Sequence, residues 1–451
     1  MSDILDRALA AATDTRRIVL GSDVLDRTGP VFAETVPGAR ATIVADETTW
    51  ALAGEPVAES LAAAGVELAE PLVFPASPTV FADYDNTLRV REHLERTGAR
   101  ACSVGSGTLN DLTKLASGEL GRGYVHVCTA ASMDGYTAFG AAITRDGFKI
   151  TRECPAPVGV IADLTVMASA PPRMLANGYG DLIDKFTGGA DWIVADELGL
   201  EPIDPAVWSL VQDPLRAALG DPDALVAGDP AALERLVEEL MLSGLAIQAH
   251  QSSRPGAGAG HHFSHQWEME GHGLDWDPPL SHGAKVAIGT LAMASLFDLA
   301  LRLDLDELDV NAIVAAWPSR EANEQRVRAS QEIPAIREAA VAHAHRMYVS
   351  ASDLPERIRA IQRAWPRIKP RVHEQLPPAA ELRDLLERIG APTHPTQIGI
   401  SPERFKRTFF QAKVIRSRYT LLDLLYEVGL LDDLVDRLFA PGGFWSPAAG
   451  R

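Results

Sequence analysis

A histidine-rich stretch at residues 250–283 has the residue types of a metal site. Six of the twelve histidines of this 451-residue chain lie there, five of them after a Gly/Ala loop at 256–260. His261 and His265 are four residues apart, so on a helix they would share one face, and His282 stands at a predicted helix start. Neutral imidazoles bind zinc, nickel or iron, and a catalytic site uses about three protein ligands and one open position. Taken alone, the stretch suits a surface loop without metal equally well.

A glycine-containing turn at residues 105–111 (GSGTLND) follows a predicted strand and opens a predicted helix. Glycines there allow the backbone to approach a phosphate closely, and the helix start supplies unpaired N–H donors and the positive end of the helix dipole. The pattern departs from G-x-G-x-x-G at its sixth position, Asn110. A tight strand–helix turn without a ligand is therefore the alternative interpretation.

Polar residues also follow two other predicted strands. Asp46 comes just after the second strand, where an acid can bind the adenine ribose hydroxyls of a dinucleotide. For Asp46 alone, capping of the next helix is the favoured interpretation. Thr129 and Ser132 follow the strand at 124–127 and are placed to contact a cofactor, and Asp134 a substrate, because ligands bind beyond the carboxyl ends of such strands. As isolated residues they could equally be turn formers.

Asp181 and Lys185 stand four residues apart in the segment GYGDLIDK. We expect Asp181 in the first turn of a helix, with Lys185 on the same face. The functional interpretation is a carboxylate metal ligand beside a cationic substrate contact. The alternative is an ion pair between residues i and i+4, which contributes only a few tenths of a kcal/mol.

Elements that could position these residues alternate between strands and helices over residues 1–166. Such alternation predicts a mostly parallel sheet covered on both faces. The predicted strands are 17–20, 41–45, 72–74, 101–104 and 124–127. One predicted helix follows the first strand and ends near residue 34, and the others span 48–64, 83–97 and 108–117. Residues 141–151 differ, because two strand-like runs flank Asp146-Gly147, a hairpin turn signal.

Helical periodicity dominates from about residue 167, and strand-like runs disappear. The predicted helices span 205–218, 230–251, 285–303, 309–319, 332–350, 354–364, 379–388 and 418–438. Residues 366–378 are expected to be a Pro-rich connection. The apolar run 286–301 is interrupted by Asp298 and is too short to cross a bilayer, so it reads as a buried helix. The fold class is therefore an α/β N-terminal nucleotide-binding domain (1–166) plus an all-α C-terminal domain (167–451).

Composition narrows the classes of partner. The chain is 46% hydrophobic and 23% charged, as in ordinary globular proteins, and its net charge is −19. This charge argues against a general affinity for nucleic acid or for an anionic membrane, and the short apolar run argues against membrane insertion. If the ligand is an anion, its positive contacts must be local. Cys102, Cys128 and Cys154 lack CxxC spacing, and the N-terminus lacks an apolar signal core. We therefore expect a cytoplasmic protein.

Taken together, five segments resemble one family: VGSGTLNDLTK, TAASMDGYT, NGYGDLIDK, SSRPGAGAGHHFSHQWEM and LSHG. Their order and context are similar to those of the sn-glycerol-1-phosphate dehydrogenases, with the bacterial branch most similar. That family belongs to the dehydroquinate synthase-like superfamily of metal-dependent alcohol dehydrogenases. The resemblance covers residues 15–300 and includes RSRYTLLDLLYEVGLL near the C-terminus. It implies the two-domain fold expected above.

The resemblance also implies roles for individual residues. One divalent ion, zinc or nickel, would be bound by Asp181, His261 and His282. The phosphate-binding turn for NAD(H) or NADP(H) would contain Gly105, Ser106, Gly107, Thr108, Leu109 and Asp111, with Thr129 and Ser132 as further cofactor contacts. Asp46 remains a cofactor candidate from its position after the second strand alone. The expected substrate contacts are Asp134, His265, Lys185 and Arg254, of which the last two are candidates for binding a phosphate.

The implied activity is NAD(P)H-dependent reduction of dihydroxyacetone phosphate to sn-glycerol 1-phosphate. The metal would act as a Lewis acid, the cofactor would supply hydride, and the proton would come through water or through His265 near its useful pKa range. Alternatives are a polyol dehydrogenase of the same superfamily, a dehydroquinate synthase-like cyclase, which has Glu where this chain has Asp181, and a nucleotide-binding protein without turnover. The oligomeric state is open, with a homodimer as one candidate.

Two departures from the family pattern stand out. The family usually has Glu immediately before the first histidine ligand, where this chain has Gly260. A missing carboxylate could weaken or reorient His261. The family also usually has Ser where this chain has Ala138, which removes one hydrogen bond to the cofactor. Neither departure removes a metal ligand.

Overall fold

The computed structural model describes residues 2–145 and 148–446, and the chain divides into two compact units. The first unit contains Met1–Leu182, Pro205–Gly256 and Arg388–Gly390, and the second contains Ile183–Asp204, Ala257–Glu387 and Ala391–Arg451. The predicted division at residue 166 differs from this one. The difference arises because several helices that follow residue 166 pack with the α/β part of the chain.

The first unit is built on a parallel sheet, as predicted, but the sheet has six strands instead of the five expected. Its strands are β1 (Arg17–Gly21), β2 (Ala41–Asp46), β3 (Leu72–Phe74), β4 (Arg100–Gly105), β5 (Val125–Cys128) and β8 (Gly159–Asp163), in the order β1-β8-β5-β4-β2-β3. The sequence analysis missed β8, although this strand is fully buried between β1 and β5. Its short apolar run, Val160-Ile161-Ala162, lacks the alternation that marks a half-buried strand.

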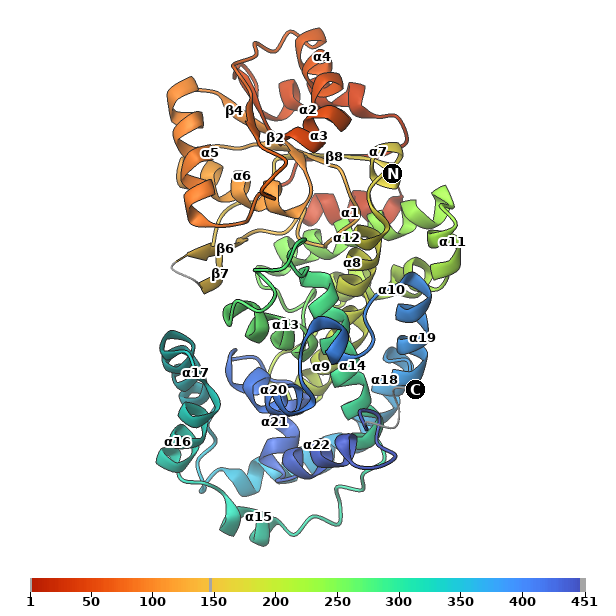
Figure 1. The fold of residues 1–451 in the computed structure, drawn as a ribbon. Coiled ribbons are helices and arrows are strands. Elements are labelled where there is room, and N and C mark those ends of the chain that lie inside the picture. The colour runs from red at the N-terminus through yellow and green to blue at the C-terminus, as the bar shows by residue number, and fades with distance from the viewer. Residues whose placement is uncertain (1, 146–147, 447–451) are drawn as a thin grey trace. The chain divides into compact units, whose positions relative to one another are not determined.

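Helices cover both faces of this sheet (Figure 1). One face carries α2 (Thr28–Thr35) and α4 (Glu55–Ala63), and the other carries α5 (Tyr84–Thr97) and α6 (Gly107–Glu119). Successive strand residues point to opposite faces. Accordingly Ile43 of β2 packs in the cluster that contains Phe32 of α2, whereas Val44 packs with Leu94 of α5. Burial on both faces explains why the strands are apolar along their whole length.

Strand order places two of the candidate turns side by side. β2 is paired with β3 on one edge and with β4 on the other, and the pairing of Val44 with Ser103 aligns the two strands. Asp46 and Gly105 each lie two residues beyond that pair, at the carboxyl ends of their strands. β3 lies on one side of β2, and the later strands β4, β5 and β8 lie on its other side, so the strand order reverses between β2 and β4. Open α/β sheets bind ligands at such a point.

The remaining elements of the first unit surround the sheet. They are α1 (Asp3–Ala11), η1 (Leu25–Arg27), α3 (Glu47–Thr49), a π-helical turn η2 (Trp50–Gly54), β6 (Ala141–Arg145), β7 (Phe148–Arg152), α7 (Leu164–Ala168), α8 (Pro172–Leu182), α10 (Pro205–Leu219), α11 (Pro222–Val226) and α12 (Pro230–His250). β6 and β7 form the predicted antiparallel hairpin. Its turn, Asp146-Gly147, lies outside the described residues.

The second unit is helical throughout its described residues, as predicted. Its elements are α9 (Asp184–Glu197), α13 (Ala259–Met269), α14 (His282–Ala300), α15 (Val310–Ala316), α16 (Arg320–Ser330), α17 (Pro334–Met347), α18 (Leu354–Gln375), α19 (Ala379–Ile389, whose end belongs to the first unit), η3 (Pro395–Ile398), α20 (Pro402–Val414), α21 (Leu421–Glu427) and α22 (Leu431–Phe439). The prediction that the apolar run 286–301 is too short to cross a bilayer is wrong, because α14 is long and apolar enough by length and composition. The prediction of a buried helix is confirmed, since 89% of that window is buried inside the protein. It is the core helix of this unit, in contact with α9, α13 and α22.

Two predictions about the helices of the second unit are wrong. The helix predicted over 418–438 is divided into α21 and α22, which residues 428–430 separate. Residues 366–378 were expected to connect helices, but α18 continues through Pro366 and Pro370 to Gln375. Each proline removes one helical hydrogen bond. The helix persists because its apolar stripe, which includes Ile361, Trp365 and Ile368, is buried over its whole length.

Candidate functional site

Three imidazoles from two helices of the second unit form one cluster. His261 and His265 lie on α13, four residues apart as predicted, and His282 is the first residue of α14. The ring centroids of His261 and His282 are 5.4 Å apart, those of His265 and His282 5.6 Å, and those of His261 and His265 6.1 Å. The structure thus brings together all three histidines that the sequence analysis selected.

His262, the neighbour of His261, points elsewhere. Its Nδ1 donates to the carbonyl oxygen of Ala412 on α20 at 3.2 Å, and burial lowers its pKa well below the usual value. The ring is therefore neutral and anchors α13 against α20. Aromatic contacts strengthen the same junction, with the rings of Phe263 and Phe409 4.9 Å apart and nearly perpendicular.

A buried carboxylate from α9 holds His261. Asp184 Oδ2 lies 2.6 Å from Nδ1 of His261, and Asp184 Oδ1 accepts hydrogen bonds from the hydroxyls of Thr187 at 2.6 Å and Thr290 at 3.2 Å. Burial alone would raise the pKa of Asp184, but the charge and hydrogen bond of His261 and the hydrogen bond of Thr187 hold that pKa below its usual value. Because a carboxylate only accepts, Nδ1 carries the hydrogen, so in the neutral form of the ring Nε2 has the lone pair that a metal requires.

This contact corrects one expectation from the sequence. The glycine at position 260 was expected to leave His261 without a supporting carboxylate, but Asp184 supplies one. Sequence reasoning missed Asp184 because its separation from His261 is 77 residues. The only local indication in the sequence was the residue type: Asp184 is a second acidic residue, next to Lys185, in a predicted helix.

A second buried carboxylate, Glu268, serves the other two rings. Its Oε1 accepts from Nδ1 of His282 at 2.9 Å, and its Oε2 accepts from Nδ1 of His265 at 3.3 Å. Glu268 is only 3% exposed. Sequence reasoning missed it too, although its position on α13, three residues after His265 and seven after His261, places all three on one helical face.

The environment of His265 changes its expected role. Desolvation, only partly offset by the hydrogen bond to Glu268, lowers the pKa of His265 to about 3. The prediction that its pKa lies in the range useful for proton delivery near neutrality is therefore wrong. At pH 7 the ring is neutral and acts as a hydrogen-bonding group.

Asp181 lies in the first unit, at the end of α8. The side chain is fully buried, and its Oδ2 accepts the backbone N–H of Asp134 at 3.0 Å. This position corrects the prediction of a first helical turn shared with Lys185. α8 begins at Pro172 and ends at Leu182, so Asp181 stands in its last turn, while Lys185 belongs to α9 of the second unit.

The segment after β5 contains three predicted ligand contacts of the first unit. Thr129 donates its N–H to the carbonyl oxygen of Gly105 at 3.0 Å, so this segment lies against the glycine turn. The hydroxyls of Ser132 and Tyr136 are 2.8 Å apart, and Asp134 Oδ2 accepts from Ser243 at 2.8 Å. These contacts fix the backbone of Thr129 and the side chains of Ser132 and Asp134.

Lys114 of α6 holds the same segment, and sequence reasoning missed it. Its buried Nζ donates to the carbonyl oxygens of Gly135 and Ala138 at 2.9 Å and of Gly140 at 3.1 Å. Since Lys114 is 1% exposed, its charge is used inside the protein rather than on a ligand. Asp111 contributes to this region as well, because its Oδ2 accepts the N–H of Ala142 at 3.3 Å.

The glycine turn joins β4 to α6 as predicted. Gly105 ends the strand, Ser106 precedes the helix, and Gly107, Thr108 and Leu109 form its first turn. A Cβ atom on Gly105 would lie 2.5 Å from a side-chain carbon of Leu109, and one on Gly107 would lie 2.3 Å from the sulfur of Met133. A side chain at either position would require Leu109 or Met133 to move.

Asp46 caps a helix, as the favoured interpretation predicted. Its Oδ1 accepts the N–H of Thr49 at 2.7 Å, and the hydroxyl of Thr49 accepts the N–H of Asp46 at 3.1 Å. This reciprocal capping box places the carboxylate at the carboxyl end of β2, beside the β4–α6 turn.

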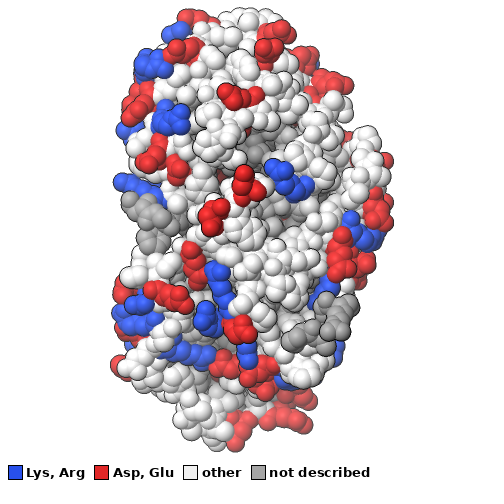
Figure 2. All heavy atoms as spheres, viewed as in Figure 1, with Lys and Arg blue, Asp and Glu red and all other residues white. Residues whose placement is uncertain are grey.

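The two candidates for phosphate binding are both buried. Lys185 is 0% exposed in α9 of the second unit. Arg254 is 3% exposed in the first unit, and its backbone N–H donates to the hydroxyl of Ser252 at 3.2 Å. Elsewhere the charges are mixed. On the face drawn in Figure 2, Lys and Arg side chains lie among Asp and Glu side chains.

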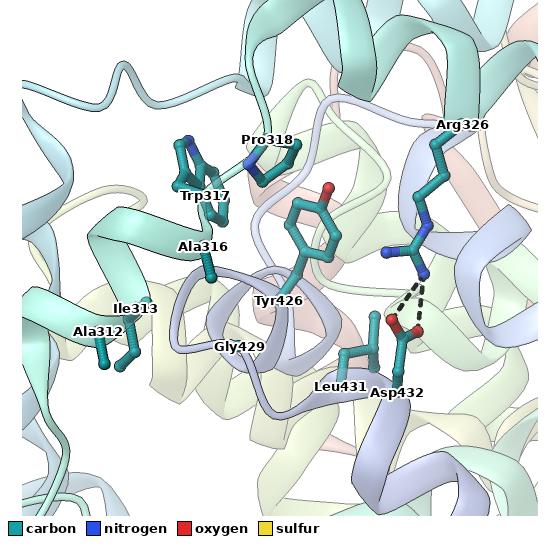
Figure 3. A pocket seen from close by; sticks show the side chains of 10 residues that line it. All are labelled: Ala312, Ile313, Ala316, Trp317, Pro318, Arg326, Tyr426, Gly429, Leu431 and Asp432. Atoms are coloured by element: carbon teal, nitrogen blue, oxygen red, sulfur yellow. Dashed lines mark hydrogen bonds and ion pairs between the residues drawn. The ribbon is translucent and has the colours of Figure 1, made fainter.

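A separate pocket of ≈ 380 Å³ lies in the second unit, and no predicted site residue lines it. Figure 3 shows Trp317 and Tyr426 beside each other, and their ring centroids are 5.2 Å apart. The ion pair of Arg326 with Asp432, 2.7 Å long, lies on the other side of Tyr426. The pocket contains none of the histidines or acids of the cluster described above. It does not contribute to the candidate site.

Comparison with known proteins gives one consistent family. The model for iron-containing alcohol dehydrogenases matches residues 19–171. The glycerol-1-phosphate dehydrogenase [NAD(P)+] of Halalkalibacterium halodurans is 36% identical over 257 residues, which are 57% of this chain and 64% of that protein. The protein of the same name from Bacillus velezensis is 34% identical over 59% of this chain and 68% of its own length. The one from Bacillus licheniformis is 27% identical over 93% of this chain and 91% of its own length.

Solved structures agree with the predicted fold class. A probable glycerol dehydrogenase from Sinorhizobium meliloti has a TM-score of 0.59 at 16% identity, and the match covers 94% of this chain and 98% of that one. At this identity the likeness shows the fold alone, an α/β part with a helical part. The family is shown by sequence: the 34% identity to the Bacillus velezensis protein, over 68% of its length, shows that the chain belongs to the glycerol-1-phosphate dehydrogenase family of NAD(P)-dependent oxidoreductases.

Proposed function

We propose that this protein reduces dihydroxyacetone phosphate to sn-glycerol 1-phosphate with NADH or NADPH and catalyses the reverse oxidation. The observation that carries the proposal is the pair His261 and His282, each held at Nδ1 by a buried carboxylate in the second unit. Carboxylate–histidine pairs of this kind orient imidazoles for a metal and raise their basicity. The names of the relatives supply the substrate class.

We assign one divalent ion, zinc or nickel, to Asp181, His261 and His282. One carboxylate and two imidazoles suit either metal, and the three side chains are buried or half-buried. Only Leu182 separates Asp181 in sequence from the first residue of the second unit. When bound, such an ion supplies a Lewis acid for the carbonyl oxygen of the substrate.

The cofactor is assigned to the first unit. Gly105 and Gly107 allow the pyrophosphate close to the backbone at the start of α6, with Thr108 and Leu109 in the same turn. Thr129 and Ser132 lie beyond the neighbouring strand β5, and Asp46 ends β2 on the other side. When bound, NADH or NADPH supplies the hydride.

Protein side chains then orient the substrate and handle the proton. Asp134, fixed by Ser243, accepts a substrate hydroxyl. His265, fixed by Glu268, is neutral at pH 7, so it orders the water that delivers a proton to the reduced oxygen instead of acting as an imidazolium acid. Lys185 and Arg254 bind the phosphate, since a dianion needs local cations in a protein of net charge −19.

The test is a panel of three assays of NADH oxidation, with dihydroxyacetone phosphate, with dihydroxyacetone and without substrate. We expect turnover of the phosphorylated ketone and little of the other. Two charge-assisted hydrogen bonds of about 1.5–3 kcal/mol each favour the phosphate by at least about a hundredfold. Lys185→Ala and Arg254→Ala should each lower kcat/KM for the phosphate more than for dihydroxyacetone. Equal use of both ketones would indicate a polyol dehydrogenase, and no turnover of either would contradict the proposal.

A further inference from the structure

We propose that Asp184 is the positioning residue of His261, and that Gly260 must be glycine because the Asp184 carboxylate fills the space next to it. The inference rests on the proposed metal-binding role of His261. It concerns three helices of the second unit: α9, which carries Asp184, α13, which carries Gly260 and His261, and α14, which carries Thr290.

Asp184 has its hydrogen-bonding partners on all three helices. Oδ2 lies against Nδ1 of His261, and Oδ1 accepts the hydroxyls of Thr187 on α9 and Thr290 on α14. The N–H of Gly258, just before α13, also points at Oδ2 at 3.5 Å. The carboxylate is 0% exposed. A group bound on so many sides has one orientation, and it passes that orientation to the ring of His261.

The space around Gly260 leaves no room for a side chain. A Cβ atom there would lie 1.9 Å from Asp184 Oδ1, 2.9 Å from its Cγ and 3.2 Å from the backbone nitrogen of Thr290. Gly260 has no positive φ that would require glycine for conformational reasons. The neighbouring carboxylate is therefore the physical reason for the glycine.

Two positions thus compete for one volume. The space beside Gly260 can hold the carboxylate of residue 184, which reaches His261 from α9, or a side chain of residue 260. It cannot hold both. Residues that share one volume have non-additive effects when they are changed. The geometry therefore predicts that Asp184→Gly opens the space into which Gly260→Glu can place its own carboxylate.

The experiment compares zinc affinity in the full-length protein by competition with a chelator. Asp184→Ala should weaken zinc binding about 10- to 100-fold, the usual cost of losing the partner of a histidine ligand. Gly260→Glu alone should bind zinc poorly as well, whereas the double variant Asp184→Gly/Gly260→Glu should recover most of the affinity. The matched control is Asp191→Asn, because Asp191 is equally buried on α9 but accepts the backbone N–H groups of Ala259 and Leu421 instead of a histidine.

A second readout does not need metal. In metal-free protein labelled with ¹⁵N-histidine, His261 should be the Nδ1–H tautomer in the parent and in Asp191→Asn, and a mixture in Asp184→Ala. If Asp184→Ala fails to fold, Asp184→Asn keeps the volume and should still weaken zinc binding. Unchanged zinc affinity and an unchanged tautomer in the folded variants would overturn the inference. A parent that binds no divalent ion would contradict the proposed metal site, and the tautomer would still decide the role of Asp184.

Discussion

Two glycine-containing segments, one in each unit, differ in what lies next to their glycines. In the β4–α6 turn of the first unit, Cβ atoms on Gly105 and Gly107 would meet the flexible side chains of Leu109 and Met133. At the start of α13 in the second unit, Cβ atoms on Gly258 and Gly260 would meet the backbone of α9 and two buried carboxylates, those of Asp191 and Asp184. In the first segment, the side chains next to the glycines at the start of α6 are flexible. In the second segment, rigid polar groups of the protein itself fill the space next to the glycines. A glycine motif therefore identifies a ligand site only once its neighbours are known.

The largest effect should follow Gly260→Ala. The added methyl group collides with a carboxylate that is hydrogen-bonded on three helices, and overpacking of this kind costs about 1–3 kcal/mol. We expect the free energy of unfolding to fall by about 3 kcal/mol and zinc to dissociate faster. Chemical denaturation and chelator competition measure the two effects. A variant as stable as the parent would mean that Asp184 can move, and the contrast between the two segments would disappear.

An intermediate effect is expected for Gly107→Val in the first unit. The side chain of Met133 can move away, so stability should change little, but the valine blocks approach of the pyrophosphate. The dissociation constant for NADH should rise at least about tenfold, or about 1.4 kcal/mol, while metal content stays the same. Fluorescence titration with NADH checks this. Unaltered affinity in a folded variant would show that the turn does not bind the cofactor.

The smallest effect should come from Thr187→Val. The change keeps the side-chain volume and removes one of the two hydroxyls that donate to Asp184 Oδ1. The loss of one buried hydrogen bond should cost about 1 kcal/mol, and zinc affinity should fall only a few-fold because Thr290 remains. Thr290→Val provides the complementary measurement. A loss as large as that of Asp184→Ala would mean that Thr187, rather than the whole network, orients the carboxylate.

Sequence reasoning succeeded where the information is local. Alternating strands and helices predicted the parallel sheet, and the spacing of His261 and His265 predicted their common helix face. It failed where the deciding partner is distant. β8 is a strand only because β1 and β5 flank it, and α18 tolerates Pro366 because other helices bury its apolar stripe.

The candidate site divides in the same way. The histidines could be selected by residue type, but the carboxylates that set their tautomers could not, since Asp184 reaches His261 from another helix. The neutral state of His265 depends on the desolvation produced by packing, which no residue pattern expresses. Gly260 is the informative case, because its departure from the family pattern predicted a weak metal site, whereas the structure supplies a different carboxylate.

The shared carboxylate of Glu268 has a dynamic consequence. Its two oxygens are fixed in one plane, and each accepts from a different ring, that of His282 or that of His265. Rotation about the Cγ–Cδ bond of Glu268 moves both oxygens together, in opposite directions. A rotation that moves one oxygen away from its ring therefore also disturbs the hydrogen bond of the other ring.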